Sequence, residues 1–153
     1  MNRLELKIPP PAIALLAAIA MWAISKSTPL MDVPRNVRLL AAGTLVLVGV
    51  ALAITGVLTF RRAGTTIHPT RPQETSALVS SGVYRISRNP MYVGLLILLI
   101  AWAVFLSSAW SLVGPFAFVL YISRFQIVPE ERVLSAKFGE AYASYKSKVR
   151  RWL

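Results

Sequence analysis

Long uncharged runs alternate with short charged segments along most of the chain. Residues 8–25, 39–60 and 91–123 contain no acidic or basic side chain. A helix needs about 20 apolar residues to cross a bilayer, so the first two runs each predict one transmembrane helix. The prolines at positions 9–11 suit the start of the first helix, because proline is tolerated in a first turn but not in a helix interior.

The first run can also be interpreted as a cleaved signal peptide. Arg3 and Lys7 precede a short apolar core, and the sequence "AIS" near its end resembles a cleavage site. We favour a transmembrane helix because a second hydrophobic segment follows at once. In that second segment, Gly43, Gly49 and Gly56 would allow another helix to pack closely.

The third run is too long for one crossing. As a single helix, residues 91–128 would extend roughly 57 Å at 1.5 Å per residue, nearly twice the ~30 Å hydrocarbon core. The segment must therefore fold back as a tight hairpin of two helices. The sequence "SSAWS" at residues 107–111 and the Gly114–Pro115 pair mark the predicted break.

The tail after Pro129 has a different periodicity. Its apolar residues recur at helical spacing, and charged residues fill the other positions. This pattern predicts a basic amphipathic helix lying along the cytoplasmic interface. Its apolar positions are Val133, Leu134, Phe138, Ala141, Tyr142, Tyr145, Val149 and Trp152.

The expected fold is an all-α integral membrane protein with about four transmembrane helices, the last two forming the hairpin. The whole chain, 1–153, forms one domain in this interpretation. Its parts are two N-terminal spans (1–60), a cytoplasmic loop (61–90), the helical hairpin (91–128) and the amphipathic C-terminal helix (129–153).

Composition and charge agree with a membrane location. Hydrophobic residues make up 56% of the chain, charged residues 15%, and the net charge is +11. Nucleic-acid binding is one explanation for such a charge, but the basic residues cluster between and after the apolar runs. Thirteen Lys and Arg lie in the N-terminus, residues 61–90 and the tail, against three between the first two spans. The positive-inside rule then places both termini in the cytoplasm, and we expect a prokaryotic inner (plasma) membrane.

Few side chains are available for chemistry. The chain has no cysteine, which removes disulfides, thiolate metal sites and a cysteine nucleophile. Because His68 is its single histidine, we expect neither a histidine-rich metal site nor a Ser-His-Asp triad, and we predict no metal. His68 precedes a proline and is interpreted as a loop residue.

The stretch "GVYRISRNPMYVG" at residues 82–94 stands at the entrance to the third run. A purely structural interpretation is available: Asn89 caps a helix, Pro90 occupies its first turn, and the tyrosines and arginines belong to the interface. The same geometry suits a ligand, because the free N–H groups of a helix start bind carboxylates. Arg85 or Arg88 could reinforce that binding, and Tyr84 offers a ring for stacking or cation contact.

Glu130 and Glu131 follow the fourth predicted span directly, on the membrane face that carries Asn89. They would complement the dipole of a helix first turn, or they would join a site with Asn89. Arg124 lies inside the fourth span, where a charge is costly unless it finds a partner or snorkels to the interface. We expect Glu130, Glu131 or an anionic ligand to be that partner.

Two segments together resemble a known enzyme family. "LVSSGVYRISRNPMYVG" followed by "EERVLSAKFGEAYASYKSKVRRWL" resembles the isoprenylcysteine carboxyl methyltransferases and the related phospholipid methyltransferases. Their pattern is Arg-His-Pro-x-Tyr before a helical hairpin, then Glu-Glu, Phe-Gly and Tyr-x-x-Tyr. The matching region is residues 76–153, and Asn89 departs from the pattern by replacing the histidine.

The resemblance implies a membrane enzyme that uses S-adenosylmethionine and accepts its substrate from the lipid. By motif, the cofactor-binding residues would be Ser76, Ala77, Leu78, Val79, Tyr84, Asn89, Pro90, Met91, Tyr92 and Glu130. Arg85, Arg88 and Glu131 would support them. An arginine that the family uses toward the acceptor falls at Gln126, and Arg124 is the candidate to substitute for it. No residue is assigned a chemical step, because the mechanism depends on positioning.

We therefore predict a methyltransferase that acts on a lipophilic acceptor such as an isoprenylcysteine-like carboxylate or another lipid. A four-span transporter subunit or a membrane anchor is the non-enzymatic alternative. A transporter would be expected to carry ionisable residues near the midplane, whereas Arg124 lies near the end of its span. The sequence leaves open the identity of the acceptor, the effect of Asn89 and the oligomeric state.

Overall fold

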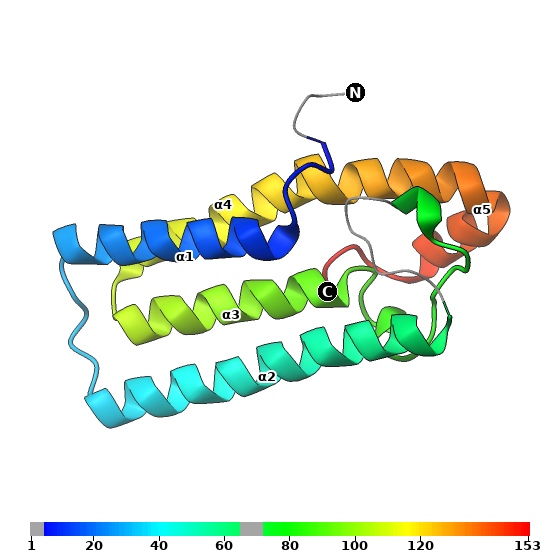
Figure 1. The fold of residues 1–153 in the computed structure, drawn as a ribbon. Helices are drawn as coiled ribbons and strands as arrows, with labels where there is room; N and C mark the ends of the chain where they lie inside the picture. Colours follow the sequence, from blue (N-terminus) through cyan, green and yellow to red (C-terminus); the bar gives the residue numbers. More distant parts are fainter. Residues whose placement is uncertain (1–4, 65–71) are drawn as a thin grey trace.

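The computed structural model describes residues 5–64 and 72–153, so His68 and part of the predicted 61–90 loop lie outside the described residues. The regular structure of the described residues is helical, and their only β-type pairing is an isolated bridge between Ser87 and Arg150. Figure 1 shows four helices running side by side: α1 (Pro10–Ser27), α2 (Arg35–Arg62), α3 (Pro90–Leu106) and α4 (Val113–Ile122). A fifth helix, α5 (Val128–Lys148), continues from the end of α4.

Three of the described helical stretches are long and apolar enough to cross a membrane. They are α1, α2 and the continuous run from Ala109 to Lys148, while α3 is a shorter apolar helix. This confirms the predicted all-α membrane fold. Outward-facing side chains such as Leu40 and Leu47, each more than 70% exposed, would be costly in water but suit contact with lipid.

α3 is the central helix of the bundle and packs against α1, α2 and α4 (Figure 1). A core of apolar side chains joins α1, α3 and α4 and includes Met21, Leu99, Phe118 and Ile122. α2 packs mainly along α3, so much of its surface faces outward. α3 therefore fixes the position of α2, and together with α4 it fixes the position of α1.

Two glycines allow α2 and α3 to pack closely. A Cβ added at Gly94 would lie 2.8 Å from the Gly49 carbonyl oxygen, and one at Gly49 would lie 3.0 Å from the Gly94 carbonyl oxygen. A Cβ at Gly56 would meet the Met91 side chain at 2.7 Å. The predicted close packing is confirmed at Gly49 and Gly56, whereas Gly43 has no neighbour within 4 Å.

The hairpin turns where the sequence predicted, at Ser107. This residue ends α3 in the left-handed conformation, with φ of 53°. Its hydroxyl donates to the Met31 carbonyl (2.9 Å), and its own carbonyl accepts the Met31 N–H (2.7 Å), which compensates the backbone strain. Gly114 and Pro115 do not form the break. They lie in the first turn of α4, where proline fits.

The C-terminal helix differs from the prediction, because it continues the fourth span. A π-helical turn (Ser123–Ile127) joins α4 to α5, and Pro129 is the second residue of α5. Pro129 has no N–H to offer the carbonyl four residues earlier, on Phe125, and that carbonyl accepts the Leu6 N–H at 3.1 Å. The helix then bends at Gly139, whose φ of 48° is non-helical, and its last turns fold back toward α3 (Figure 1).

The described basic segments gather at one end of the bundle. The start of α1, the end of α2, residues 72–90 and α5 lie together there, and the α1–α2 connection with Lys26 and Arg35 lies at the other end (Figure 1). This arrangement agrees with the predicted four-span topology, in which the N-terminus, residues 61–90 and the tail lie on one side of the membrane and the connection between the first two spans lies on the other. The orientation of the two ends in the cell remains a prediction.

We expect Gly94→Ala to destabilise the protein, because the added Cβ would lie against backbone atoms of α2. Overpacking of this kind costs about 1–3 kcal/mol of unfolding free energy. Thermal unfolding of the purified protein in detergent measures the effect. Gly43→Ala is the matched control: it should be neutral or slightly stabilising, because alanine favours a helix by ~0.5–1 kcal/mol. Equal unfolding temperatures for the two variants would contradict the proposed close contact.

Candidate functional site

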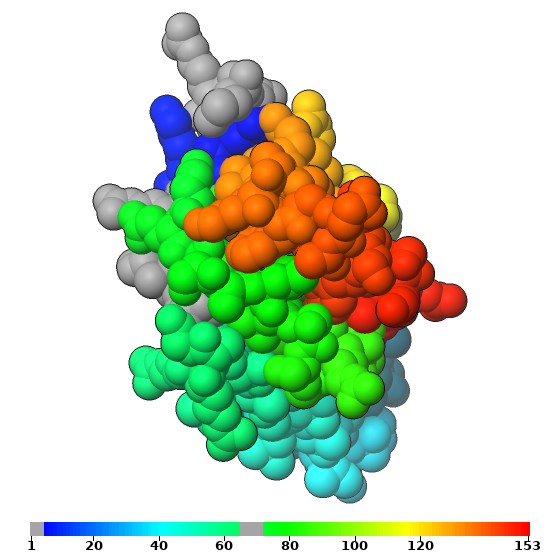
Figure 2. All heavy atoms as spheres, turned by 90° about the vertical axis from the view of Figure 1, so that its right-hand side faces the viewer, coloured from blue at the N-terminus to red at the C-terminus, as the bar shows by residue number. Residues whose placement is uncertain are grey.

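A cavity of about 370 Å³ opens at the basic end of the bundle. Its walls come from α2, the start of α3, α5 and the segment at residues 72–85. In the face shown in Figure 2, this segment lies between the end of α2 and α5, with the C-terminus beside it. Eight of the ten residues predicted to bind a cofactor line the cavity: Ala77, Leu78, Val79, Tyr84, Asn89, Met91, Tyr92 and Glu130. Ser76 and Pro90 do not line it.

Glu130 presents its carboxylate to this cavity and is held from two sides. The Tyr92 hydroxyl donates to Glu130 Oε1 at 2.7 Å, and Gln126 Nε2 donates to the same oxygen at 2.6 Å. Tyr92 comes from α3 and Gln126 from the π-helical turn, so the bonds join two helices. Because charge-assisted bonds are short and directional, they fix the orientation of the carboxylate.

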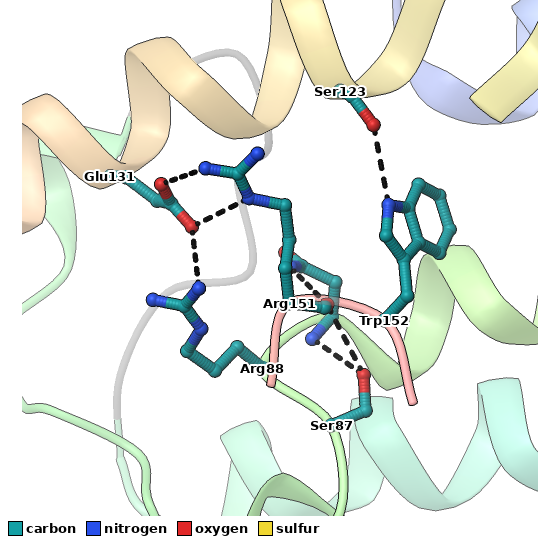
Figure 3. A network of polar contacts seen from close by, with 7 residues as sticks. Ser87, Arg88, Ser123, Glu131, Arg151 and Trp152 are labelled. Atoms are coloured by element: carbon teal, nitrogen blue, oxygen red, sulfur yellow. Dashed lines mark hydrogen bonds and ion pairs between the residues drawn. The ribbon is translucent and has the colours of Figure 1, made fainter. Parts of the chain in front are cut away.

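Glu131 lies beside it and is compensated by two arginines (Figure 3). Arg151 forms a two-pronged contact, Nε to Oε1 at 3.1 Å and Nη2 to Oε2 at 2.7 Å. Arg88 Nη2 lies 3.2 Å from Oε1. The Glu131 side chain is 12% exposed, so two cationic partners offset its loss of hydration. The hydrogen bonds to Glu131 raise the pKa of Arg151 above its usual value.

Residues 150–152, near the C-terminus, lie across the start of α3, and we call this segment the strap (Figure 3). The Arg88 N–H donates to the Arg150 carbonyl (2.9 Å), and Asn89 Nδ2 donates to the Arg151 carbonyl (2.8 Å). Trp152 Nε1 donates to Ser123 Oγ at 3.2 Å. Asn89 occupies the N-cap position, as predicted, but its side chain makes no capping hydrogen bond. Its amide holds the strap instead.

Aromatic side chains line one part of the cavity. Tyr84 packs edge-on against Phe60 with ring centroids 5.1 Å apart, and Tyr145 donates its hydroxyl to the Tyr84 carbonyl at 2.6 Å. Burial, with smaller contributions from Tyr145 and Glu130, raises the pKa of Tyr84 well above its usual value. The Tyr84 hydroxyl is therefore a neutral donor at physiological pH.

Two groups in the cavity wall are buried without hydrogen-bond partners among the described residues. They are the Tyr84 hydroxyl and the Nε and Nη1 atoms of Arg88. Buried donors are normally satisfied, and leaving one unpaired costs free energy. Both residues line the cavity, so the arrangement favours a ligand with an anionic or strongly accepting group.

The remaining predicted residues lie outside the cavity wall. Arg85 is exposed on the surface. Gln126 is buried, and it contacts Glu130 from behind. The expected pairing of Arg124 with Glu130 or Glu131 is wrong: Arg124 lies 4.0 Å from Glu5, and its side chain is 58% exposed. The structure therefore gives no support to a contact between Arg124 and an acceptor in this cavity.

Sequence reasoning missed Glu5 and the role of Arg151. The buried Glu5 carboxylate accepts a 2.8 Å contact from Arg132, in addition to its contact with Arg124, and so ties the N-terminal segment to the fourth helix. An acidic residue just before an apolar run carries no signal of burial. Arg151 is one of six basic residues in the tail, and its sequence position, twenty residues after Glu131, carries no signal of their contact.

Comparison with known proteins gives matches over most of the chain. The family model described as phospholipid methyltransferase matches residues 37–141. An uncharacterized protein of Haemophilus influenzae is 48% identical over 63 residues, which are 41% of this chain and all of that protein. Protein-S-isoprenylcysteine O-methyltransferase B of Arabidopsis thaliana is 34% identical over 109 residues, covering 69% of this chain and 54% of the plant protein.

A rice relative gives the same picture. The probable protein-S-isoprenylcysteine O-methyltransferase of Oryza sativa subsp. indica is 33% identical over 108 residues, covering 69% of this chain and 55% of the rice protein. The chain thus spans about half the length of the plant relatives it matches. The family match includes α3 and Glu130, and it ends before the C-terminal strap.

Replacing Arg151 should loosen the strap. In Arg151→Gln, the ionic contacts with Glu131 are lost, and the strap should open about five times more often, a value reduced for the partial exposure of the arginine. Carboxypeptidase digestion of the folded protein measures this as faster release of Leu153 and Trp152. Arg150→Gln is the control, because the Arg150 contacts to Ser87 and Arg88 use its backbone. Equal release from both variants would argue against the strap.

Proposed function

The chain belongs to the phospholipid methyltransferase family, and we propose that it moves a methyl group from S-adenosylmethionine to a lipophilic acceptor, with the 370 Å³ cavity as the cofactor site. The observation that carries the proposal is the convergence of Tyr84, Tyr92 and Glu130 on one cavity beside an arginine with unpaired donors. These residues come from segments far apart in the sequence. Their meeting suits a ligand with both anionic and cationic groups.

The chemistry of the cavity wall fits this cofactor. S-adenosylmethionine carries a carboxylate, an ammonium and a sulfonium, and an adenine ring. The free donors of Arg88 and Tyr84 match the carboxylate, and the Glu130 carboxylate matches positive charge. The rings of Phe60, Tyr84 and Tyr145 provide faces for a flat ring or a cation. The volume lies within the ~300–1,000 Å³ usual for small-molecule sites.

When bound, the cofactor supplies a methyl group that its sulfonium has already activated, so the protein must chiefly hold the reactants and exclude water. Tyr92 and Gln126 fix Glu130 from α3 and the π-helical turn. The strap, held by Asn89 and Glu131, lies at the start of α3, next to these two residues of the cavity wall. These bonds preorganise the wall, and alignment of this kind can supply roughly 7–11 kcal/mol of a barrier.

We infer that the acceptor atom is a carboxylate oxygen of a lipophilic molecule. The described wall of the cavity contains no histidine, and its two carboxylates, Glu130 and Glu131, are already held by hydrogen bonds and ion pairs. A carboxylate acceptor requires no base. The Arabidopsis and rice relatives are named as O-methyltransferases, which supports an oxygen acceptor. Apolar lining from Ala53, Val57 and Leu95 suits a hydrocarbon chain.

Family membership favours this enzyme over the transporter subunit and the membrane anchor left open by the sequence. We also propose that the end of the bundle that holds the cavity faces the cytoplasm, in the inner (plasma) membrane of a prokaryote. The support is the excess of lysine and arginine at that end.

Cysteine labelling in intact cells tests this orientation, since the chain has no cysteine of its own. Asp32 and Ser147 are both exposed, at opposite ends of the bundle. An impermeant thiol reagent should label Asp32→Cys directly and Ser147→Cys only after the membrane is permeabilised. The opposite pattern would place the cavity on the outer side and refute the orientation.

Titration calorimetry with S-adenosylmethionine tests the cofactor site. The purified protein should bind saturably, and Arg88→Gln should weaken binding about tenfold or more, since charge-assisted hydrogen bonds contribute ~1.5–3 kcal/mol. Glu130→Gln should also weaken it, because the amide lacks the negative charge. Arg85→Gln is the matched control, an arginine three residues away that is exposed and outside the wall.

Two calorimetric outcomes would contradict the proposed cofactor site. Folded wild-type protein that gives neither binding heat nor a thermal shift with S-adenosylmethionine would refute the proposed cofactor. An equal loss in Arg85→Gln and Arg88→Gln would mean that the effect comes from general positive charge and would refute the assigned site. Thermal unfolding of each variant establishes that the compared proteins are folded.

A further inference from the structure

A second cavity, of about 490 Å³, lies at the opposite end of the bundle from the candidate active site. It is bounded by the end of α1, the connection to α2, the first turn of α2 and the last turns of α3. The 17 residues of α3 separate the two ends by about 25 Å at 1.5 Å per residue. The second cavity is therefore a separate site, near the other membrane surface.

Hydrogen bonds fix the walls of this second cavity. The hydroxyls of Thr28 and Ser108 lie 2.9 Å apart and join the α1–α2 connection to the hairpin turn. Trp102 Nε1 donates to the Ala18 carbonyl at 3.0 Å, which locks its ring between α1 and α3. Since these polar groups already have partners, the wall is a built surface.

Two basic residues, Lys26 and Arg38, line the cavity without an acidic partner among the described residues. Lys26 Nζ lies 5.5 Å from the centre of the Trp22 ring, and Arg38 Nε is buried without a hydrogen-bond partner among the described residues. Neither side chain forms an ion pair within 4.0 Å in the described part of the chain. Asp32, the acid in the connecting segment, pairs with neither. A buried guanidinium donor left unpaired is costly, so the geometry calls for an anion.

The rest of the lining is apolar and aromatic. Trp102, Phe105 and Leu106 of α3 line the cavity, as does Leu30, and Trp102 and Phe105 stack with ring centroids 5.3 Å apart. Trp22 and Leu30 are 50% and 64% exposed, so the cavity borders a surface that suits lipid. Tryptophan rings beside basic residues are typical of the level of phospholipid headgroups.

We propose that this cavity binds an anionic phospholipid from the leaflet opposite the candidate active site. Lys26 and Arg38 would take the headgroup phosphate, as basic pockets between transmembrane helices do. Trp102, Phe105 and Leu106 would contact the glycerol and the first part of an acyl chain. Two neighbouring cations beside an apolar wall that is open to the bilayer favour a lipid phosphate over a free anion. This proposal does not depend on methyl transfer.

Lipid-dependent thermal unfolding tests the proposal. The full chain, purified in a non-ionic detergent, is titrated with dioleoyl-phosphatidylglycerol or dioleoyl-phosphatidylcholine, and unfolding is followed by Trp fluorescence. The anionic lipid should raise the unfolding temperature saturably and more than the zwitterionic lipid does. In Lys26→Gln/Arg38→Gln, the apparent affinity for the anionic lipid should fall about 25-fold, because each cation contributes about fivefold.

Controls separate this site from general charge. Arg35→Gln, an exposed arginine on the first turn of α2 outside the cavity, should keep the wild-type response. The single variants Lys26→Gln and Arg38→Gln should each lose part of it, which keeps the test usable if the double variant does not fold. Inorganic phosphate should give little shift. An equal response to both lipids, an unchanged response in the cavity variants, or a full response to phosphate alone would overturn the proposal.

Discussion

A carboxylate removed from water needs donors or cations around it, and this requirement organises the basic end of the molecule. Glu130 and Glu131 are adjacent, and both are largely withdrawn from solvent where the fourth helix leaves the apolar bundle. Tyr92 and Gln126 satisfy Glu130, while Arg88 and Arg151 satisfy Glu131. The partners come from α3, the segment before it, the π-helical turn and the C-terminus. Four parts of the chain thus meet because two neighbouring acids require them.

The π-helical turn is what lets a single helix carry both the span and these acids. Pro129 interrupts the hydrogen-bond ladder, and the widened turn accommodates its ring. The carbonyl that loses its partner, on Phe125, is satisfied by the Leu6 N–H, which also brings Glu5 to Arg124 and Arg132. Gln126 and Glu130 are then four residues apart on one face, so their side chains meet. One proline thereby anchors the N-terminus and helps to orient the carboxylate of the cavity.

Features that follow from length and periodicity could be predicted, and features that depend on a distant partner could not. The arithmetic of a helix too long for a bilayer predicted the turn at Ser107, and the four-span topology predicted that Tyr92 and Glu130 would lie at one end. The burial of Glu5 depends on contacts with Arg124 and Arg132, more than a hundred residues away. The bend at Gly139 left no periodic signal, because the apolar spacing continues across it. Pro129 did carry a signal, since its missing N–H implies an unsatisfied carbonyl at Phe125.

The replacement of histidine by Asn89 can be understood from what the residue contacts. Its amide donates to the Arg151 carbonyl at 2.8 Å, so in this protein the position is used for holding the C-terminal strap. An asparagine can meet that need, because the need is for a donor and not for a base. The same reasoning bears on the reaction. Even with the Asn89 amide engaged in holding the strap, the protein can transfer a methyl group to a carboxylate, since an ionised acceptor has no proton to lose. A reaction of this kind requires that the reactants are aligned and that water is excluded, and the bonds around Glu130 and Glu131 are suited to hold the site in such an arrangement.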